Sequence, residues 1–171
     1  METREALRAR RNIRTYQDRM IPQDDLQVIL EAGRRSPSSK NQQRWDFIVC
    51  TNRSQLERLS DVWRGASFVA TSAVTVALIA PLSEEPAIRD SIQYDLGQVT
   101  MAMMIAAADR GIGSSHTYVA DQDLARELLA HPAQMFCAWL MAFGYPADRP
   151  LTPVRNPNRR DYEDVVHIDR W

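Results

Sequence analysis

The chain has 171 residues and a formal net charge of −1, with 21 basic and 22 acidic side chains. This length suits a single domain with a substantial core, which we expect to span residues 1–171. The balanced charge argues against a nucleic-acid-binding protein, because such proteins take much of their affinity from a basic face that neutralises phosphates. Any anion that this chain binds must therefore be held by a local cluster of cations.

The two cysteines, Cys50 and Cys137, lie far apart in sequence, and each sits in an apolar run without CxxC spacing. This pattern favours buried thiols over a disulfide or a zinc site. The three histidines are scattered, so no metal site is predicted. The amino terminus lacks the apolar core of a signal peptide, and the longest apolar runs are too short to cross a bilayer. We therefore expect a soluble, cytoplasmic protein.

The first half of the chain reads as helices that alternate with a strand. An amphipathic helix is predicted over about 2–10, and a second helix opens at Pro22, a residue that suits the first helical position. Gly33 stands near the predicted end of that helix. Residues 45–51 read as a strand, and the spacing of Ser54 and Glu57 predicts a capping box for a helix that runs to about residue 62.

The second half contains the most apolar segments. Residues 73–80 and 134–143 are predicted strands, and the nearly continuous apolar run of the first is typical of a strand that is buried on both faces. Residues 87–110 form the longest helical pattern, which is apolar on every side over its last third and is therefore expected in a core or a subunit interface. Gly97 would let another helix approach closely.

The predicted long helix is followed by a mixed set of shorter elements. Residues 111–119 end it and enter a short extended segment, and Asp121 is a candidate cap for a helix over 121–130. Four prolines after residue 145 predict an extended excursion without helix. Residues 163–167 then form either an edge strand or a short tail. The whole pattern predicts an α+β protein with few strands.

Near the amino terminus, three arginines, Arg10, Arg11 and Arg14, flank Asn12 and Ile13. A guanidinium offers planar, forked donors that match a phosphate or a carboxylate two bonds at a time. The isoleucine is expected to turn inward, which would make the segment an anion clamp that is anchored to the core. The alternative is a solvated helix end, because arginine is the default cation of a chain with one lysine.

Other polar stretches add to this cluster. Residues 36–44 form a loop rich in hydroxyl and amide groups, which is either a linker or a surface that recognises a flat polar ligand. The Gly-Ile-Gly-Ser-Ser turn at 111–115 does not complete a dinucleotide-binding fingerprint. A further basic pair, Arg159 and Arg160, stands near the carboxyl end. Together these stretches suit a ligand with a phosphate at one end and a flat ring system at the other.

These stretches resemble, in order, the motifs of the FMN-dependent nitroreductase family. Residues 10–16 resemble its opening motif and residues 37–45 its second motif, while the helix from residue 95 to the turn at 111–113 is similar to its third region. The carboxyl-terminal end of the family is matched by three short stretches, at 144–146, 159–160 and 165–167. The resemblance implies a nitroreductase-like fold, in which helices flank a central mixed or antiparallel sheet and a long buried helix lies at a dimer interface.

The resemblance also implies an activity. A homodimer would bind FMN at the subunit interface, take a hydride from NAD(P)H at flavin N5, and pass it in ping-pong order to a nitroaromatic, a quinone or a similar small acceptor. No side chain is expected as a catalytic acid or base, because this chemistry belongs to the cofactor. The alternative is a flavin-binding storage or redox-sensing protein without efficient turnover. Neither reading involves a nucleic acid or a membrane.

The resemblance assigns twelve residues to FMN. The phosphate and ribityl group would be held by four arginines, Arg10, Arg11, Arg159 and Arg160. Asn12 and Arg14 would face the pyrimidine edge of the ring, where a cation stabilises the negative charge that develops on reduction.

The other six come from two further segments. The second subunit would contribute Pro37, Ser38, Ser39 and Asn41. Ser115 and His116 would lie beside the ring, where backbone groups can reach flavin N5 and O4, and a packing role is favoured for His116 over proton donation. Two departures from the family pattern, Asn12 for the usual serine and Arg44 for the usual proline, bear on substrate specificity more than on flavin binding.

Overall fold

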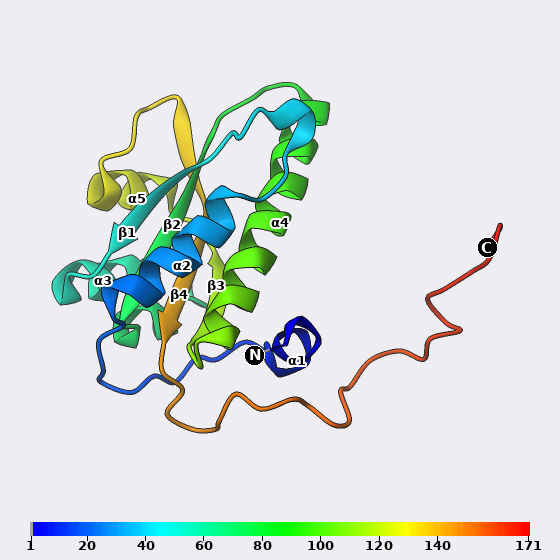
Figure 1. The fold of residues 1–171 in the computed structure, drawn as a ribbon. Helices are drawn as coiled ribbons and strands as arrows, with labels where there is room; N and C mark the ends of the chain where they lie inside the picture. Colours follow the sequence, from blue (N-terminus) through cyan, green and yellow to red (C-terminus); the bar gives the residue numbers. More distant parts are fainter. Residues whose placement is uncertain (1) are drawn as a thin grey trace.

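The computed structural model describes residues 2–171 and consists of an antiparallel sheet between two layers of helices (Figure 1). The strands, in the order β1-β2-β4-β3, are β1 (Asp46–Cys50), β2 (Val74–Pro81), β4 (Met135–Gly144) and β3 (Gly113–Tyr118). One face is covered by α2 (Gln23–Arg34) and α4 (Pro86–Asp109), and the other by α3 (Arg53–Leu59) and α5 (Gln122–Leu129). The first helix, α1 (Thr3–Ala9), packs against α4. The predicted α+β fold is confirmed.

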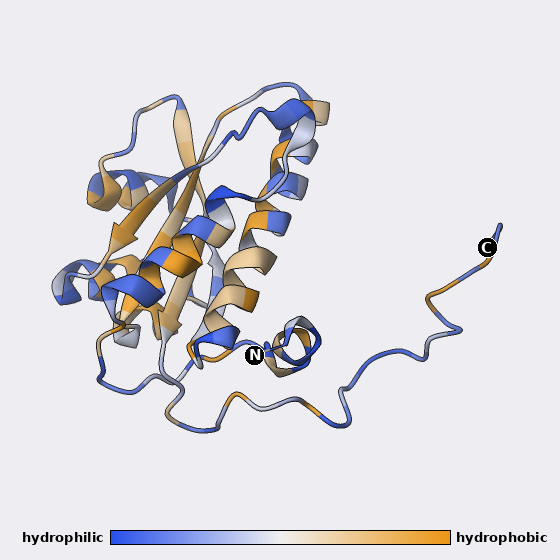
Figure 2. Ribbon diagram, in the orientation of Figure 1, coloured by the Kyte–Doolittle hydropathy of each residue, from blue (hydrophilic) through white to orange (hydrophobic). Residues whose placement is uncertain are grey.

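The central strand β2 shows why its sequence is almost continuously apolar. Val76 and Leu78 are fully buried in the cluster beneath α2 and α4, while Ala77 and Ile79 are buried in the cluster beneath α3 and α5. Successive side chains of a strand point to opposite faces, so a strand that is covered on both sides must be apolar at every position. Figure 2 shows the same pattern, with apolar residues along the strands and polar residues on the outer helix surfaces.

The arginine-rich segment is fixed to the edge of β3. Asn12 forms an isolated parallel bridge with Ser114, and the backbone N–H of Ile13 donates to the Ser114 carbonyl at 2.9 Å. The Ile13 side chain is fully buried, and a Cβ at Gly113 would lie 2.8 Å from its Cβ. The predicted inward turn of Ile13 is confirmed, and Gly113 provides the space that this close approach requires.

Local signals at three helix starts had different outcomes. The predicted capping box at Ser54 is wrong, because Asn52 is the N-cap of α3: its side-chain oxygen accepts from the Gln55 N–H at 3.1 Å and from the Ser54 hydroxyl at 2.7 Å. Pro22 stands one position earlier than predicted, at the N-cap of α2. The predicted cap at Asp121 is confirmed, since its carboxylate accepts from the Leu124 N–H at 2.9 Å.

The long helix α4 is buried against the sheet and α2 but keeps an open outer stripe. Met103 is fully buried and lies so close to α2 that a Cβ at Gly33 would be 2.3 Å from its Cε. On the outer side, Tyr94 is 74% exposed and Gly97 has no atom within 4 Å of the position of a Cβ. Met101 and Ile105 continue this stripe and are only half-buried.

After β4 the chain leaves the body of the molecule as an extended tail (Figure 1). Its start is tied to the segment after α1, because the Ala147 N–H donates to the Thr15 carbonyl and the Val154 N–H donates to the Arg8 carbonyl. From residue 155 to the end every residue is exposed, including Trp171 at 97%. Residues 163–165 form a turn and residues 163–167 contain no strand, so the tail is the correct one of the two predicted alternatives.

We expect Gly113→Ala to destabilise the protein by about 1–3 kcal/mol, because the added methyl group would overlap the branched, fully buried Ile13 and push the arginine segment away from β3. The midpoint of urea denaturation measures this loss. Gly33→Ala is the matched comparison: its Cβ meets the flexible end of Met103, so its loss should be clearly smaller. Equal midpoints for the two variants would contradict this account of the segment.

Candidate functional site

Buried polar atoms without a hydrogen-bond partner gather along the arginine segment and the neighbouring strand β3. Among the described residues they include the Nε atoms of Arg10 and Arg11, the Oδ1 atom of Asn12 and the Nδ1 atom of His116. Such atoms are uncommon in folded proteins, since each one costs about 1–3 kcal/mol when it is left unpaired. Their concentration at one edge of the sheet indicates a place where a polar ligand supplies the missing partners.

His116 is held in an electropositive, partly dry environment. It pairs across the sheet with Met141, and its ring packs edge-to-face against Trp139 with the centroids 5.7 Å apart. Burial lowers the pKa of His116 below its ordinary value of 6.5, and the charges of Arg14 and Arg10 lower it further. The imidazole is therefore neutral at pH 7, which suits a packing or hydrogen-bonding group better than a source of positive charge.

Ser115 and His116 point to opposite faces of β3, because consecutive strand residues alternate. The cross-strand partner of Ser115 is Ala142, which belongs to the core beneath α3 and α5. The Ser115 side chain is fully buried, and its hydroxyl oxygen has no hydrogen-bond partner. The Ser115 hydroxyl therefore cannot bind a ligand on the face that carries His116, where Ser115 can offer only its backbone groups.

Arg14 stands on the exposed side of the segment, and its guanidinium carbon lies 5.7 Å from the centre of the Phe68 ring. The next aromatic residue, Tyr16, is buried, and its hydroxyl donates to the Ile13 carbonyl at 2.6 Å. Burial raises the pKa of Tyr16 well above its usual range, although the charge of Arg14 opposes this shift. Tyr16 thus fixes the turn that carries Arg14, a role that the sequence did not reveal.

A basic hollow of about 600 Å³ lies between the end of α1 and the tail. Its charged lining consists of arginines alone: Arg8, Arg10, Arg11, Arg155 and Arg159. Three of these were predicted from sequence, whereas Arg8 and Arg155 were missed, because neither local pattern nor spacing shows that the tail returns past α1. The predicted Arg160 lies outside this lining and donates to the Asp164 carbonyl.

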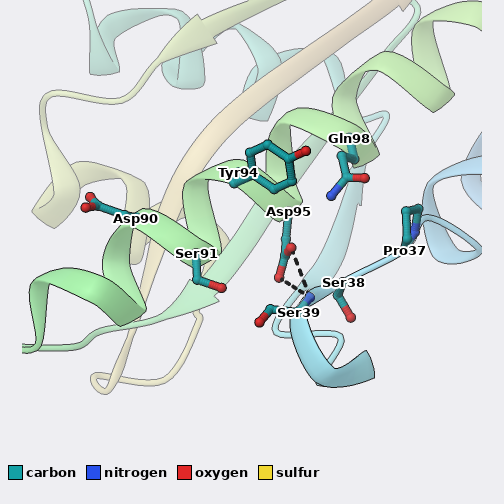
Figure 3. A pocket seen from close by; sticks show the side chains of 8 residues that line it. All are labelled: Pro37, Ser38, Ser39, Asp90, Ser91, Tyr94, Asp95 and Gln98. Carbon is teal, nitrogen blue, oxygen red and sulfur yellow. Dashed lines mark hydrogen bonds between the residues drawn. The ribbon is translucent and has the colours of Figure 1, made fainter. Parts of the chain in front are cut away.

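The residues predicted in the 36–44 loop lie against α4. Pro37, Ser38 and Ser39 line a second hollow of about 620 Å³, whose other wall is α4 (Figure 3). The Ser39 N–H donates to both carboxylate oxygens of Asp95, at 3.1 and 3.2 Å. Asn41 is outside the lining, and its N–H donates to the Ser38 carbonyl at 2.9 Å.

A single chain does not bring the two predicted groups together. The 36–44 loop lies beside the first half of α4, and the arginine segment lies near the opposite end of the same helix (Figure 1). The structure therefore assembles Arg10, Arg11, Asn12, Arg14, Ser115, His116 and Arg159 around one end, and places Pro37, Ser38, Ser39 and Asn41 at the other.

The described residues provide neither a metal site nor a reactive thiol. In the described range 2–171, no group of three or more His, Cys, Asp or Glu side chains could hold a metal ion, and no helix is long and apolar enough to cross a membrane. Cys50 and Cys137 are free and buried. Burial raises the pKa of the Cys50 thiol to about 11 and that of Cys137 to about 12, so both thiols stay protonated and unreactive at neutral pH.

Comparisons with known proteins agree on one family. A sequence profile described as "Nitroreductase family" matches residues 7–70. A protein of Archaeoglobus fulgidus, provisionally named NADH dehydrogenase/NAD(P)H nitroreductase, is 31% identical over 168 residues, which cover 95% of this chain and 94% of that protein. The FMN reductase [NAD(P)H] of Bacillus subtilis is 23% identical, over 99% of this chain and 74% of its own. The structure of an FMN-dependent nitroreductase from Clostridium difficile superposes with a TM-score of 0.85 at 24% identity, covering 97% of this chain and 98% of that one.

We expect acidification to destabilise the protein through His116. Its pKa is lower in the folded state than the 6.5 of the unfolded chain, so between the two values only the unfolded chain binds the proton. Stability from this group is complete above about pH 6.5 and is lost as the pH falls through the lowered pKa. Urea denaturation at a series of pH values should show this loss in the wild type and a flatter profile in His116→Asn. His167→Asn, in the exposed tail, is the control and should match the wild type.

Proposed function

This chain belongs to the nitroreductase family, and we propose that it is an FMN-dependent oxidoreductase that takes electrons from NAD(P)H and reduces nitroaromatic, quinone or similar acceptors. The family relationship rests on the relative that is 31% identical over nearly the full length of both chains. The observation in this chain that carries the proposal is the row of unpartnered buried polar atoms from Arg10 to Asn12 and at His116.

The residues present fit FMN. The basic hollow offers several guanidinium groups and no acidic side chain, which suits a phosphate monoester. Beside it, the Asn12 side-chain oxygen is a free acceptor, and Arg14 is a cation on the exposed side of the same segment. An acceptor and a cation side by side match the pyrimidine edge of a flavin, which carries an N–H group and gains negative charge when the ring is reduced.

Each part of the site then has a distinct task. Arg10, Arg11 and Arg159 bind the phosphate, and Asn12 orients the ring edge. Arg14 stabilises the charge of the reduced ring, which raises its midpoint potential. His116 is neutral and packed against Trp139, so it shapes the site and excludes water. When bound, FMN would supply the hydride chemistry, with NAD(P)H as the donor and the small molecule as the acceptor in ping-pong order.

We further propose that the working unit is a homodimer with two sites at its interface. The two groups of predicted residues lie at opposite ends of α4 in one chain (Figure 1). A two-fold axis that crosses α4 would bring the 36–44 loop of one copy to the arginine segment of the other, because such an interface pairs unlike ends of the same surface. The open stripe at Tyr94, Gly97 and Met101 and the exposed apolar side chains of the tail support this arrangement.

The first test is reconstitution of the purified chain with FMN. We expect a yellow protein that retains FMN through gel filtration and oxidises NAD(P)H when an acceptor is present. Rapid bleaching of the bound flavin by NAD(P)H in stopped flow supports the enzyme, whereas retained FMN without bleaching would favour storage or redox sensing. A protein that takes up no FMN would overturn both readings.

The arginine segment should divide into two functions. Arg10→Ala should raise the dissociation constant of FMN by about ten- to a hundredfold, because a charge-assisted phosphate contact is lost. Arg14→Ala should lower the flavin midpoint potential by about 20–40 mV and reduce turnover, because the reduced ring loses a stabilising cation. Fluorescence titration and spectroelectrochemistry measure these changes. Arg4→Ala, at an exposed position of α1, is the control and should change neither quantity. If both site variants behaved like Arg4→Ala, the segment would be a solvated helix end.

The dimer has its own test. Gly97→Arg adds a long charged side chain to the open stripe of α4, where a single chain has free space. We expect the variant to remain folded by circular dichroism and to sediment as a monomer, with weakened FMN binding because each site loses its second half. Gln27→Arg, on the exposed side of α2, is the matched control and should sediment as the wild type does. A Gly97→Arg variant that still dimerises would exclude this face.

A further inference from the structure

Asp95 is a buried carboxylate in the first half of α4. Only 3% of the residue is exposed, and in the described range 2–171 no cation lies within ion-pair distance of it. Its two oxygens share a single donor, the backbone N–H of Ser39. Burying a charge without a cation is costly, so a packing role alone would favour an apolar or neutral residue at this position. The presence of a carboxylate at this position is therefore best explained by the segment that it binds, the 36–44 loop.

The 36–44 loop, which Asp95 binds, has a strained backbone. The backbone is in the left-handed region, which residues other than glycine rarely adopt, at Lys40, Asn41 and Gln43, with φ values of 53°, 55° and 48°. Only asparagine among the three tolerates this conformation well. Hydrogen bonds within the loop include those from the Asn41 N–H to the Ser38 carbonyl, from the Gln42 N–H to the Ser39 carbonyl and from the Gln43 N–H to the Ser38 hydroxyl. The bond to Asp95 ties this strained unit to a rigid helix (Figure 3).

Strained backbone persists only where the surrounding structure enforces it, and it is concentrated at functional sites. We propose that Asp95 is a positioning residue of the flavin site. Its carboxylate accepts a hydrogen bond from the Ser39 N–H and thereby holds Pro37, Ser38 and Ser39 at the position along α4 from which they reach the FMN of a neighbouring copy. This inference rests on the proposed function. Asp95 itself is only 3% exposed, and the proposal assigns it no contact with the cofactor.

The first arm of the test needs no flavin. In the full chain without FMN, Asp95→Ala should speed amide hydrogen exchange at Ser39 by about tenfold or more, because a bond to a charged acceptor is lost. Asp95→Asn keeps one acceptor oxygen and should give an intermediate rate. Asp90→Asn is the matched control: Asp90 stands on the same helix and lines the same hollow, but its side chain takes part in none of the described hydrogen bonds or ion pairs. Its exchange rate should equal that of the wild type.

The second arm measures FMN. Asp95→Ala should raise the dissociation constant of FMN by about tenfold, with Asp95→Asn in between and Asp90→Asn unchanged. Lys40 lies outside the proposed cofactor contacts. Lys40→Gly removes its left-handed strain, and so makes the conformation of the loop less dependent on the hydrogen bond between Ser39 and Asp95. Added to Asp95→Asn, it should recover FMN affinity by up to about fivefold. A residue that only stabilised the fold would show no such rescue.

Three results would contradict either the positioning role of Asp95 or the proposed function. FMN affinity within about twofold of the wild type in both Asp95 variants, alongside faster exchange at Ser39, would overturn the positioning role and leave the proposed function intact. Unchanged exchange would overturn it as well. A wild type that binds no FMN would overturn the proposed function, and that result is read from the wild-type titration alone. If Asp95→Ala does not fold, Asp95→Asn and its Lys40→Gly double variant carry both arms.

Discussion

The burial of Ile13 against β3 is the contact on which the site depends. Its side chain fills the space left by Gly113, and its N–H is bonded to Ser114, so the residues on either side have fixed directions. A basic segment without such an anchor would be solvated and mobile, and its cations would have to be ordered at the moment of binding. Anchoring removes that cost in advance, which is the physical meaning of a preorganised site.

The electrostatic character of the site is local and does not come from the whole molecule. The chain is nearly neutral, yet five arginines and no acidic side chain line the hollow beside α1, and the neighbouring His116 stays uncharged at neutral pH. Cations next to a neutral imidazole do not form an acid–base pair. They form a surface that binds an anion and polarises a ring, which agrees with a reaction whose bond-making belongs to a cofactor.

The helix α4 organises the molecule at a larger scale, because it supports a different half of the proposed site at each end. Near its carboxyl end the arginine segment lies beside β3, and in its first half Asp95 holds the strained loop. Its inner face is filled by the core, while its outer stripe is open in a single chain. One rigid element thus fixes the distance between two half-sites, and a symmetric pair of such helices would make both sites complete together.

The sequence by itself determined the elements and the polar segments worth attention. The strands β1, β2 and β4 and the helix α4 could be predicted because apolar patterning is a property of residues within one element, whereas the polar β3 was predicted only as a short extended segment. The inward turn of Ile13 followed from its single apolar side chain among cations. The N-cap of α3 was misassigned because Asn52 and Ser54 are both good caps, and only the backbone path decides between them. Family motifs added most of the candidate site.

Only the tertiary structure decided which of these residues meet. It brought Arg8 and Arg155 to the basic hollow and left Arg160 outside, turned Ser115 and His116 to opposite faces, and placed Asp95 beneath the loop. The reason is physical: spacing along a chain encodes the period of a helix or a strand, whereas the approach of a tail to a helix, or of a carboxylate to a distant N–H, depends on how whole elements pack.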